Sequence, residues 1–101
     1  MRKDAGQITL TGSGCNVQAV LVGEVDLAAV QRFRAAHQRP GPIADLVAEH
    51  LTFIDSSGLK FLLQLQAANP GMRLVRPSRA LTDLLEITGT ASRFGLADAT
   101  G

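Results

Sequence analysis

The sequence predicts an α/β fold in which helices pack against a mixed β-sheet of four to five strands. Short runs rich in Val, Ile and Leu alternate with segments of helical periodicity, and clusters of Gly and Pro separate them. The 101 residues, 46% of them apolar, suit one domain with its own core. We expect residues 1–101 to form that domain, in the order β-β-α-β-α-β-α-(β). The later strands should be parallel and linked by right-handed crossovers.

A hairpin opens the predicted fold. Residues 8–11 alternate between apolar and polar side chains, as a half-buried strand does. Gly12-Ser13-Gly14 supplies a turn, because glycine adopts positive φ without steric cost. Residues 16–22, rich in Val and Leu, are expected to form the second and more buried strand.

The first helix is expected from residue 27 to about residue 38. The segment Gly23-Glu24-Val25-Asp26 should break the preceding strand, and Asp26 is a good N-cap because its carboxylate accepts backbone N–H groups. Apolar side chains fall on one side of this helix: Leu27, Val30, Phe33 and Ala36. Pro40-Gly41-Pro42 ends the helix.

The middle of the chain predicts a strand and a second helix. Residues 43–47 are expected to form a central strand, and residues 48–53 a loop or a second short extended piece. The helix runs from about residue 57 to 68 and ends at Asn69-Pro70-Gly71. Its many apolar residues favour packing in the core, with a partly exposed docking surface as the alternative.

The C-terminal part predicts a strand, a third helix and a last weak strand. The strand covers residues 72–75. Ser78 is expected to cap the helix, in which Leu81, Leu84 and Leu85 recur at helical spacing, and Gly89 to end it. The weak strand covers residues 94–97.

Charge and cysteine content exclude several classes of protein. The net charge is +1 and the arginines are dispersed, so no demand for nucleic acid is visible. Cys15, the only cysteine, cannot form an internal disulfide, which indicates a reducing compartment and a small buried or half-buried side chain. No apolar run reaches the roughly 18 residues of a membrane span, and no secretory signal begins the chain. We expect a cytoplasmic protein without membrane insertion.

The candidate site is the segment Leu51-Thr52-Phe53-Ile54-Asp55-Ser56-Ser57-Gly58-Leu59, at the entry to the second helix. One interpretation is structural: one hydroxyl caps the helix and Gly58 permits close approach of the backbone. The other is that one serine accepts a phosphate, which adds about −1.5 to −2 charges. The partial positive charge at the helix start favours a phosphate, whereas Asp55 and a docked partner repel it. Phosphorylation is then predicted to leave the fold intact and to release a partner.

The sequence has residue types found in enzymes but not the patterns. A serine of the pair, His50 and Asp55 are the groups of a catalytic triad, yet the G-x-S-x-G elbow is missing and no oxyanion hole can be identified. The two histidines and Cys15 lack zinc-ligand spacing, and no phosphate-binding glycine motif occurs. We expect a protein that binds other proteins, with no catalytic residue, no metal and no cofactor.

Two motifs resemble those of a known family. Gly23-Glu24-Val25-Asp26 is similar to a G-E-x-D that ends the second strand, and residues 51–59 are similar to a phosphorylation loop. Their spacing and Pro77-Ser78 before the third helix also fit. From about Ile8 to Phe94 the chain resembles a STAS domain, in particular the bacterial anti-sigma factor antagonists, or anti-anti-sigma factors.

This resemblance implies a regulator of transcription. Such antagonists bind a serine kinase that is also an anti-sigma factor, and so free a sigma factor. The kinase phosphorylates the serine after the loop aspartate, here Ser56, and a metal-dependent serine phosphatase restores binding. Asp26 and Asp55 match acidic residues near the acceptor, Ser57 matches a hydroxyl that helps form the loop and cap the helix, and Gly58 belongs to the same loop. The kinase supplies nucleotide and metal, so the chain needs no cofactor.

The chain also departs from this family. Many members carry another helix after the last strand, whereas this sequence stops at Gly101, so either the domain is a trimmed variant or its last element is missing. A second function stays open, that of a STAS subunit regulating the ATPase of an ABC-type lipid transporter. Such subunits often have Thr at the first serine, so Asp55-Ser56-Ser57-Gly58 favours the antagonist. A small serine hydrolase is the remaining alternative.

Overall fold

In the computed structural model, which describes residues 6–37, 42–90 and 94–96, five strands form one sheet. Their order across the sheet is their order along the chain. The first two strands are antiparallel, and each later strand is parallel to the one before it. The strands are Gln7–Thr11 (β1), Gln18–Val25 (β2), Asp45–Ile54 (β3), Arg73–Val75 (β4) and Gly95–Leu96 (β5). This topology confirms the predicted mixed sheet.

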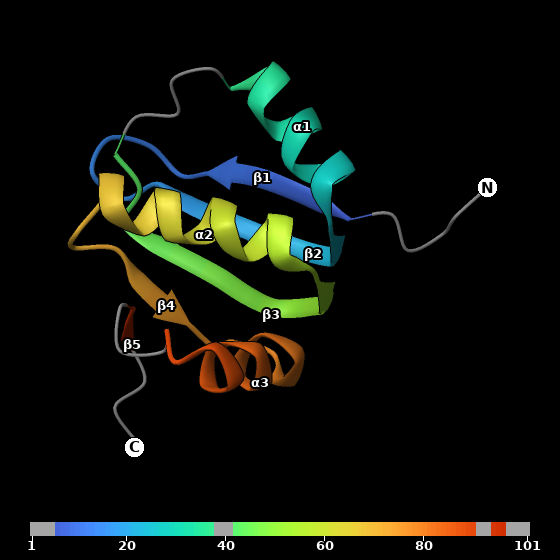
Figure 1. Cartoon of the computed structure of the whole chain (residues 1–101). Coiled ribbons are helices and arrows are strands. Elements are labelled where there is room, and N and C mark those ends of the chain that lie inside the picture. The colour runs from blue at the N-terminus through green and yellow to red at the C-terminus, as the bar shows by residue number, and fades with distance from the viewer. Residues whose placement is uncertain (1–5, 38–41, 91–93, 97–101) are drawn as a thin grey trace.

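The described ranges also contain three helices: Leu27–Ala36 (α1), Ser56–Ala68 (α2) and Arg79–Thr88 (α3). Figure 1 shows α1 and α2 on the same side of the sheet, with α2 in front of β2 and β3. β4 pairs only with the first three residues of β3. α3 packs against β3 beyond that point, and its N-cap residue Ser78 donates its backbone N–H to the Ala48 carbonyl oxygen at 2.9 Å. The order of elements is the predicted one.

Strand β2 continues through Gly23 to Val25, so the predicted break at residues 23–26 is wrong. Gly23 has φ of 76°, and the pairing of β2 with β3 shifts register between Gly23 and Glu24. These are the features of a β-bulge, in which glycine takes the conformation that other residues avoid. The glycine therefore bends the strand without ending it.

Strand β3 is one continuous strand of 10 residues, so the predicted loop over residues 48–53 is wrong and the extended alternative is right. Its exposed residues come in pairs, Glu49-His50 and Thr52-Phe53. Two register shifts against β2 interrupt the alternation of buried and exposed side chains. The period of two that identifies a strand in a sequence is therefore absent here.

The helix ends agree with the local signals where the structure describes them. α1 ends at Ala36, slightly before the predicted position, and the stop expected from Pro40-Gly41 lies outside the described residues. Ser78 accepts the Leu81 backbone N–H at 3.3 Å, and Gly89 ends α3 with φ of 71°, as predicted. The last strand is Gly95–Leu96, and residue 97 lies outside the described ranges.

The core lies between the sheet and the helices. Its largest fully buried side chains are Leu21, Val25, Leu46, Leu62, Met72, Leu74 and Leu81. The apolar helix α2 buries Leu59, Phe61, Leu62 and Leu65, which confirms that most of it packs in the core. Cys15 is exposed, so the prediction of a buried or half-buried side chain is wrong. It lies in the connection between β1 and β2.

Candidate functional site

Two strand–helix junctions lie side by side at one edge of the sheet. Val25 at the end of β2 is paired with Ile54 at the end of β3, and the two strands are parallel. Asp26 directly follows Val25, and Asp55 directly follows Ile54. The Asp55 backbone N–H donates to the Val25 carbonyl oxygen at 3.4 Å. The structure thus brings together two aspartates that are far apart in the sequence.

Each aspartate caps the helix that follows it. Asp26 Oδ1 accepts the Ala29 backbone N–H at 3.0 Å, and Asp55 Oδ1 accepts the Gly58 backbone N–H at 2.9 Å. The expectation that a serine hydroxyl caps α2 is therefore wrong. The carboxylate of Asp55 holds that position, and Ser56 and Ser57 become the first two residues of the helix.

The two serines differ in exposure. Ser56 is exposed and Ser57 is half-buried. Both lie in the first turn of α2, where backbone N–H groups create a partial positive charge. Ser56 is therefore the hydroxyl that another protein reaches more easily, and its surroundings combine a favourable helix end with the negative charge of Asp55.

Gly58 allows the start of α2 to rest on the end of β2. A Cβ atom at this position would lie 2.5 Å from the Val25 carbonyl oxygen and 2.7 Å from Ile54 Cγ1. The first of these contacts is with backbone, which has little freedom to move away. Glycine is therefore required for packing here, as the structural interpretation of the segment expected.

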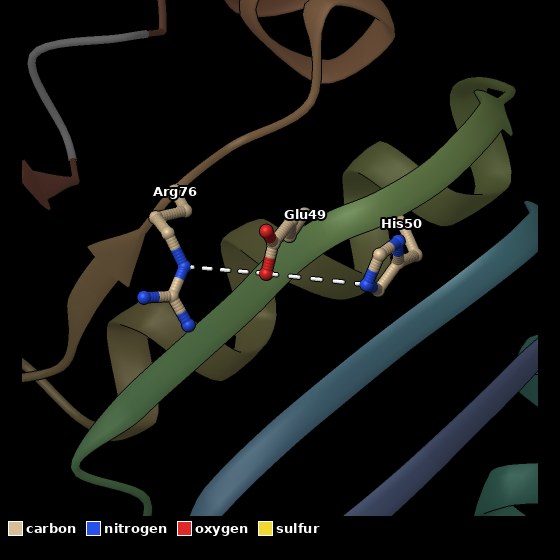
Figure 2. Close-up of polar contacts among 3 residues, drawn as sticks. All are labelled: Glu49, His50 and Arg76. Carbon is tan, nitrogen blue, oxygen red and sulfur yellow. Dashed lines mark ion pairs between the residues drawn. The ribbon is translucent and has the colours of Figure 1, made fainter.

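His50 lies on the other side of the sheet from the serines. Figure 2 shows the side chains of Glu49, His50 and Arg76 on the near side of the sheet, with α2 behind β3. Glu49 Oε1 is 3.2 Å from Arg76 Nε and 4.0 Å from His50 Nε2, and the His50 side chain is 73% exposed. The residue types of a triad are thus not assembled around Ser56. Among the described residues, no cluster of three His, Cys, Asp or Glu side chains could hold a metal ion.

Leu27 lies beside the site and is exposed, although the sequence predicts it on the apolar side of its helix. Its relative exposure is 52%. It is the first residue of α1, directly after Asp26, where the helix begins at the edge of the sheet. Its position next to an N-cap was the only signal of exposure in the sequence.

The fold is that of a STAS domain. The chain is similar to the solved structure of the anti-sigma factor antagonist SpoIIAA in its unphosphorylated form. The TM-score is 0.63 and the sequence identity 25%, over 91% of this chain and 89% of that chain. No family model and no curated protein matches the sequence. The similarity confirms the predicted STAS fold and its likeness to the anti-sigma factor antagonists.

A helix that spans a membrane needs about 20 consecutive, mostly apolar residues. None of the helices in the described part of the chain is long and apolar enough to cross a bilayer.

Proposed function

We propose that this chain is an anti-sigma factor antagonist whose binding to an anti-sigma factor with serine kinase activity is switched by phosphorylation of Ser56. The unphosphorylated chain binds the kinase in the cytoplasm and so releases a sigma factor for transcription. The observation that carries the proposal is the exposed Ser56 at the first position of α2, directly after the N-cap Asp55. The similarity to an anti-sigma factor antagonist supports this class of partner over a transporter ATPase.

The position of Ser56 supports a switch that acts on binding and not on folding. A phosphate on Ser56 lies at the positive end of the α2 dipole, which stabilises negative charge. The side chain is exposed, so the phosphate needs no space in the core. The added charge of about −1.5 to −2 instead repels a partner that docks around Asp26 and Asp55.

The other residues of the loop support the acceptor. Asp26 and Asp55 hold the two helix starts in place through their N-cap hydrogen bonds, and so fix the surface that the kinase contacts. Ser57 shapes the loop, and Gly58 holds α2 close to β2. A serine phosphatase acting on the phosphorylated form restores binding. The chain itself contributes no cofactor.

Incubation with ATP and any serine kinase of the anti-sigma factor class that is encoded beside this chain tests the proposal. Intact-mass spectrometry should detect one phosphate, and peptide mapping should place it on Ser56. The variant Ser56→Ala should remain unmodified, while the matched variant Ser57→Ala should still accept the phosphate. A phosphate on Ser57, or none with the co-encoded kinase, would overturn the assignment.

A further inference from the structure

A groove between α1 and α2 opens beside the serine pair. It encloses about 220 Å³, and its lining includes Leu27, Val30, Arg34, Ser57, Lys60 and Phe61. Three of these side chains are apolar, two are cationic and none is a carboxylate. The exposed Leu27 adds apolar surface at the end of the groove nearest Asp26.

The groove is lined by two cations, Arg34 and Lys60. The Arg34 guanidinium donates to Gln64 Oε1 and lies 5.6 Å from the centre of the Phe61 ring, so it is held over the groove. Lys60 is exposed, and it is the only charged residue in α2. Within the residues that the structure describes, neither cation forms an ion pair with a carboxylate.

We propose that the α1–α2 groove binds an acidic segment of the kinase that carries an apolar anchor, and that phosphorylation of Ser56 weakens this contact by drawing Lys60 onto the phosphate. Charge complementarity favours an acidic occupant, because Arg34 and Lys60 have no acidic partners among the described residues. The apolar side chains that line the same groove favour an apolar anchor. The proposal rests on the function proposed above. It adds the groove that binds the partner and the residue, Lys60, through which the phosphate weakens binding.

The helix geometry links Lys60 to the switch. Ser56 and Lys60 are four residues apart in α2, a spacing that puts both side chains on one face of a helix. An anion four residues before a cation is the favourable orientation of such a pair. A phosphate on Ser56 therefore competes with the carboxylates of a partner for Lys60. Asp26 and Asp55, the nearby acidic residues at the two helix starts, are already engaged as N-caps.

The first test needs only the chain itself, with phosphoserine incorporated at position 56 during translation. A ³¹P NMR titration measures the second pKa of the phosphate in this protein and in its Lys60→Gln form. Loss of Lys60 should raise that pKa by roughly 0.2–0.4 units, as expected for an i,i+4 ion pair. The control Arg76→Gln, which removes a positive charge on the other side of the sheet, should leave the pKa unchanged. An unchanged pKa in Lys60→Gln would overturn the coupling.

The second test measures the affinity of the unphosphorylated chain for the co-encoded kinase. Lys60→Gln and Arg34→Gln should each raise Kd by roughly three- to tenfold, and Arg76→Gln should not. Phosphorylation should also cost less affinity in Lys60→Gln than in the wild type. Wild-type affinity in both groove variants would overturn the docking site and leave the proposed function intact. If the wild type itself does not bind the kinase, the proposed function and the docking site both fail, while the titration still decides the pairing of Lys60.

Discussion

Phe33 of α1 and Phe61 of α2 meet edge to face, with ring centroids 5.3 Å apart and an angle of 68° between the rings. Both side chains are buried, and Phe61 also lines the groove that opens beside Ser57. This contact therefore fixes α1 against α2. It joins the bodies of the two helices that follow Asp26 and Asp55.

Loss of this aromatic pair should lower stability. Phe33→Leu keeps an apolar side chain but removes the edge-to-face contact, so the free energy of unfolding should fall by about 1–2 kcal/mol. Urea denaturation followed by circular dichroism measures the change. The control Leu27→Ser, at an exposed position, should alter stability by less than about 0.5 kcal/mol. Equal losses in both variants would show that the ring contact adds nothing.

Gly58→Ala should destabilise the domain because the new Cβ would meet the Val25 carbonyl oxygen. Overpacking of this kind costs about 1–3 kcal/mol, which exceeds the gain in helix propensity of up to about 1 kcal/mol. Thermal or urea denaturation gives the difference. Gly71→Ala is the matched control, since no atom lies within 4 Å of a Cβ at that position. A Gly58→Ala protein as stable as Gly71→Ala would contradict the close contact.

Substitution of Asp55 should separate its capping role from its charge. Asp55→Ala removes the acceptor for the Gly58 backbone N–H and should cost about 1 kcal/mol of stability. Asp55→Asn keeps an oxygen acceptor and should stay within about 0.5 kcal/mol of the wild type. Any change in phosphorylation rate that Asp55→Asn shows is then an effect of charge. Equal destabilisation by both variants would mean that the capping hydrogen bond is not the source of the effect.

Ser56→Asp should weaken binding to the kinase without unfolding the chain. The new carboxylate lies in the first turn of α2, where negative charge is favoured, so stability should stay within about 1 kcal/mol of the wild type. Isothermal titration calorimetry measures the affinity, and thermal denaturation measures the stability. Ser56→Asn, of similar size but neutral, is the control and should bind more tightly than Ser56→Asp. Unfolding of both variants would assign Ser56 a structural role.

Much of this structure follows from local signals in the sequence. Asp26, Ser78 and Gly89 act as the predicted helix boundaries, because capping depends on side chains within a few residues of the helix end. The order of strands and helices follows from alternating patterns of the same short range. Resemblance of two motifs to a family then indicated the fold that the solved antagonist structure supports.

The details that were predicted wrongly depend on contacts between distant segments. Whether residues 48–53 extend β3 was decided by pairing with β2, whose register shifts remove the alternating pattern. The choice of Asp55 over a serine as the cap of α2 was decided by where that helix starts against the end of β2. Neither contact can be predicted from a local sequence pattern, because such a pattern involves only residues that are close together in the chain.

The sequence by itself determined that Asp26 and the segment 51–59 belong to the candidate site, because each lies in a local motif of consecutive residues. Only the tertiary structure decided that Asp26 stands beside Asp55, that Ser56 is exposed, and that Leu27 and Lys60 border a common groove. Parallel pairing of β2 with β3 is the physical reason. It brings the ends of both strands, and the starts of both helices, to one edge of the sheet.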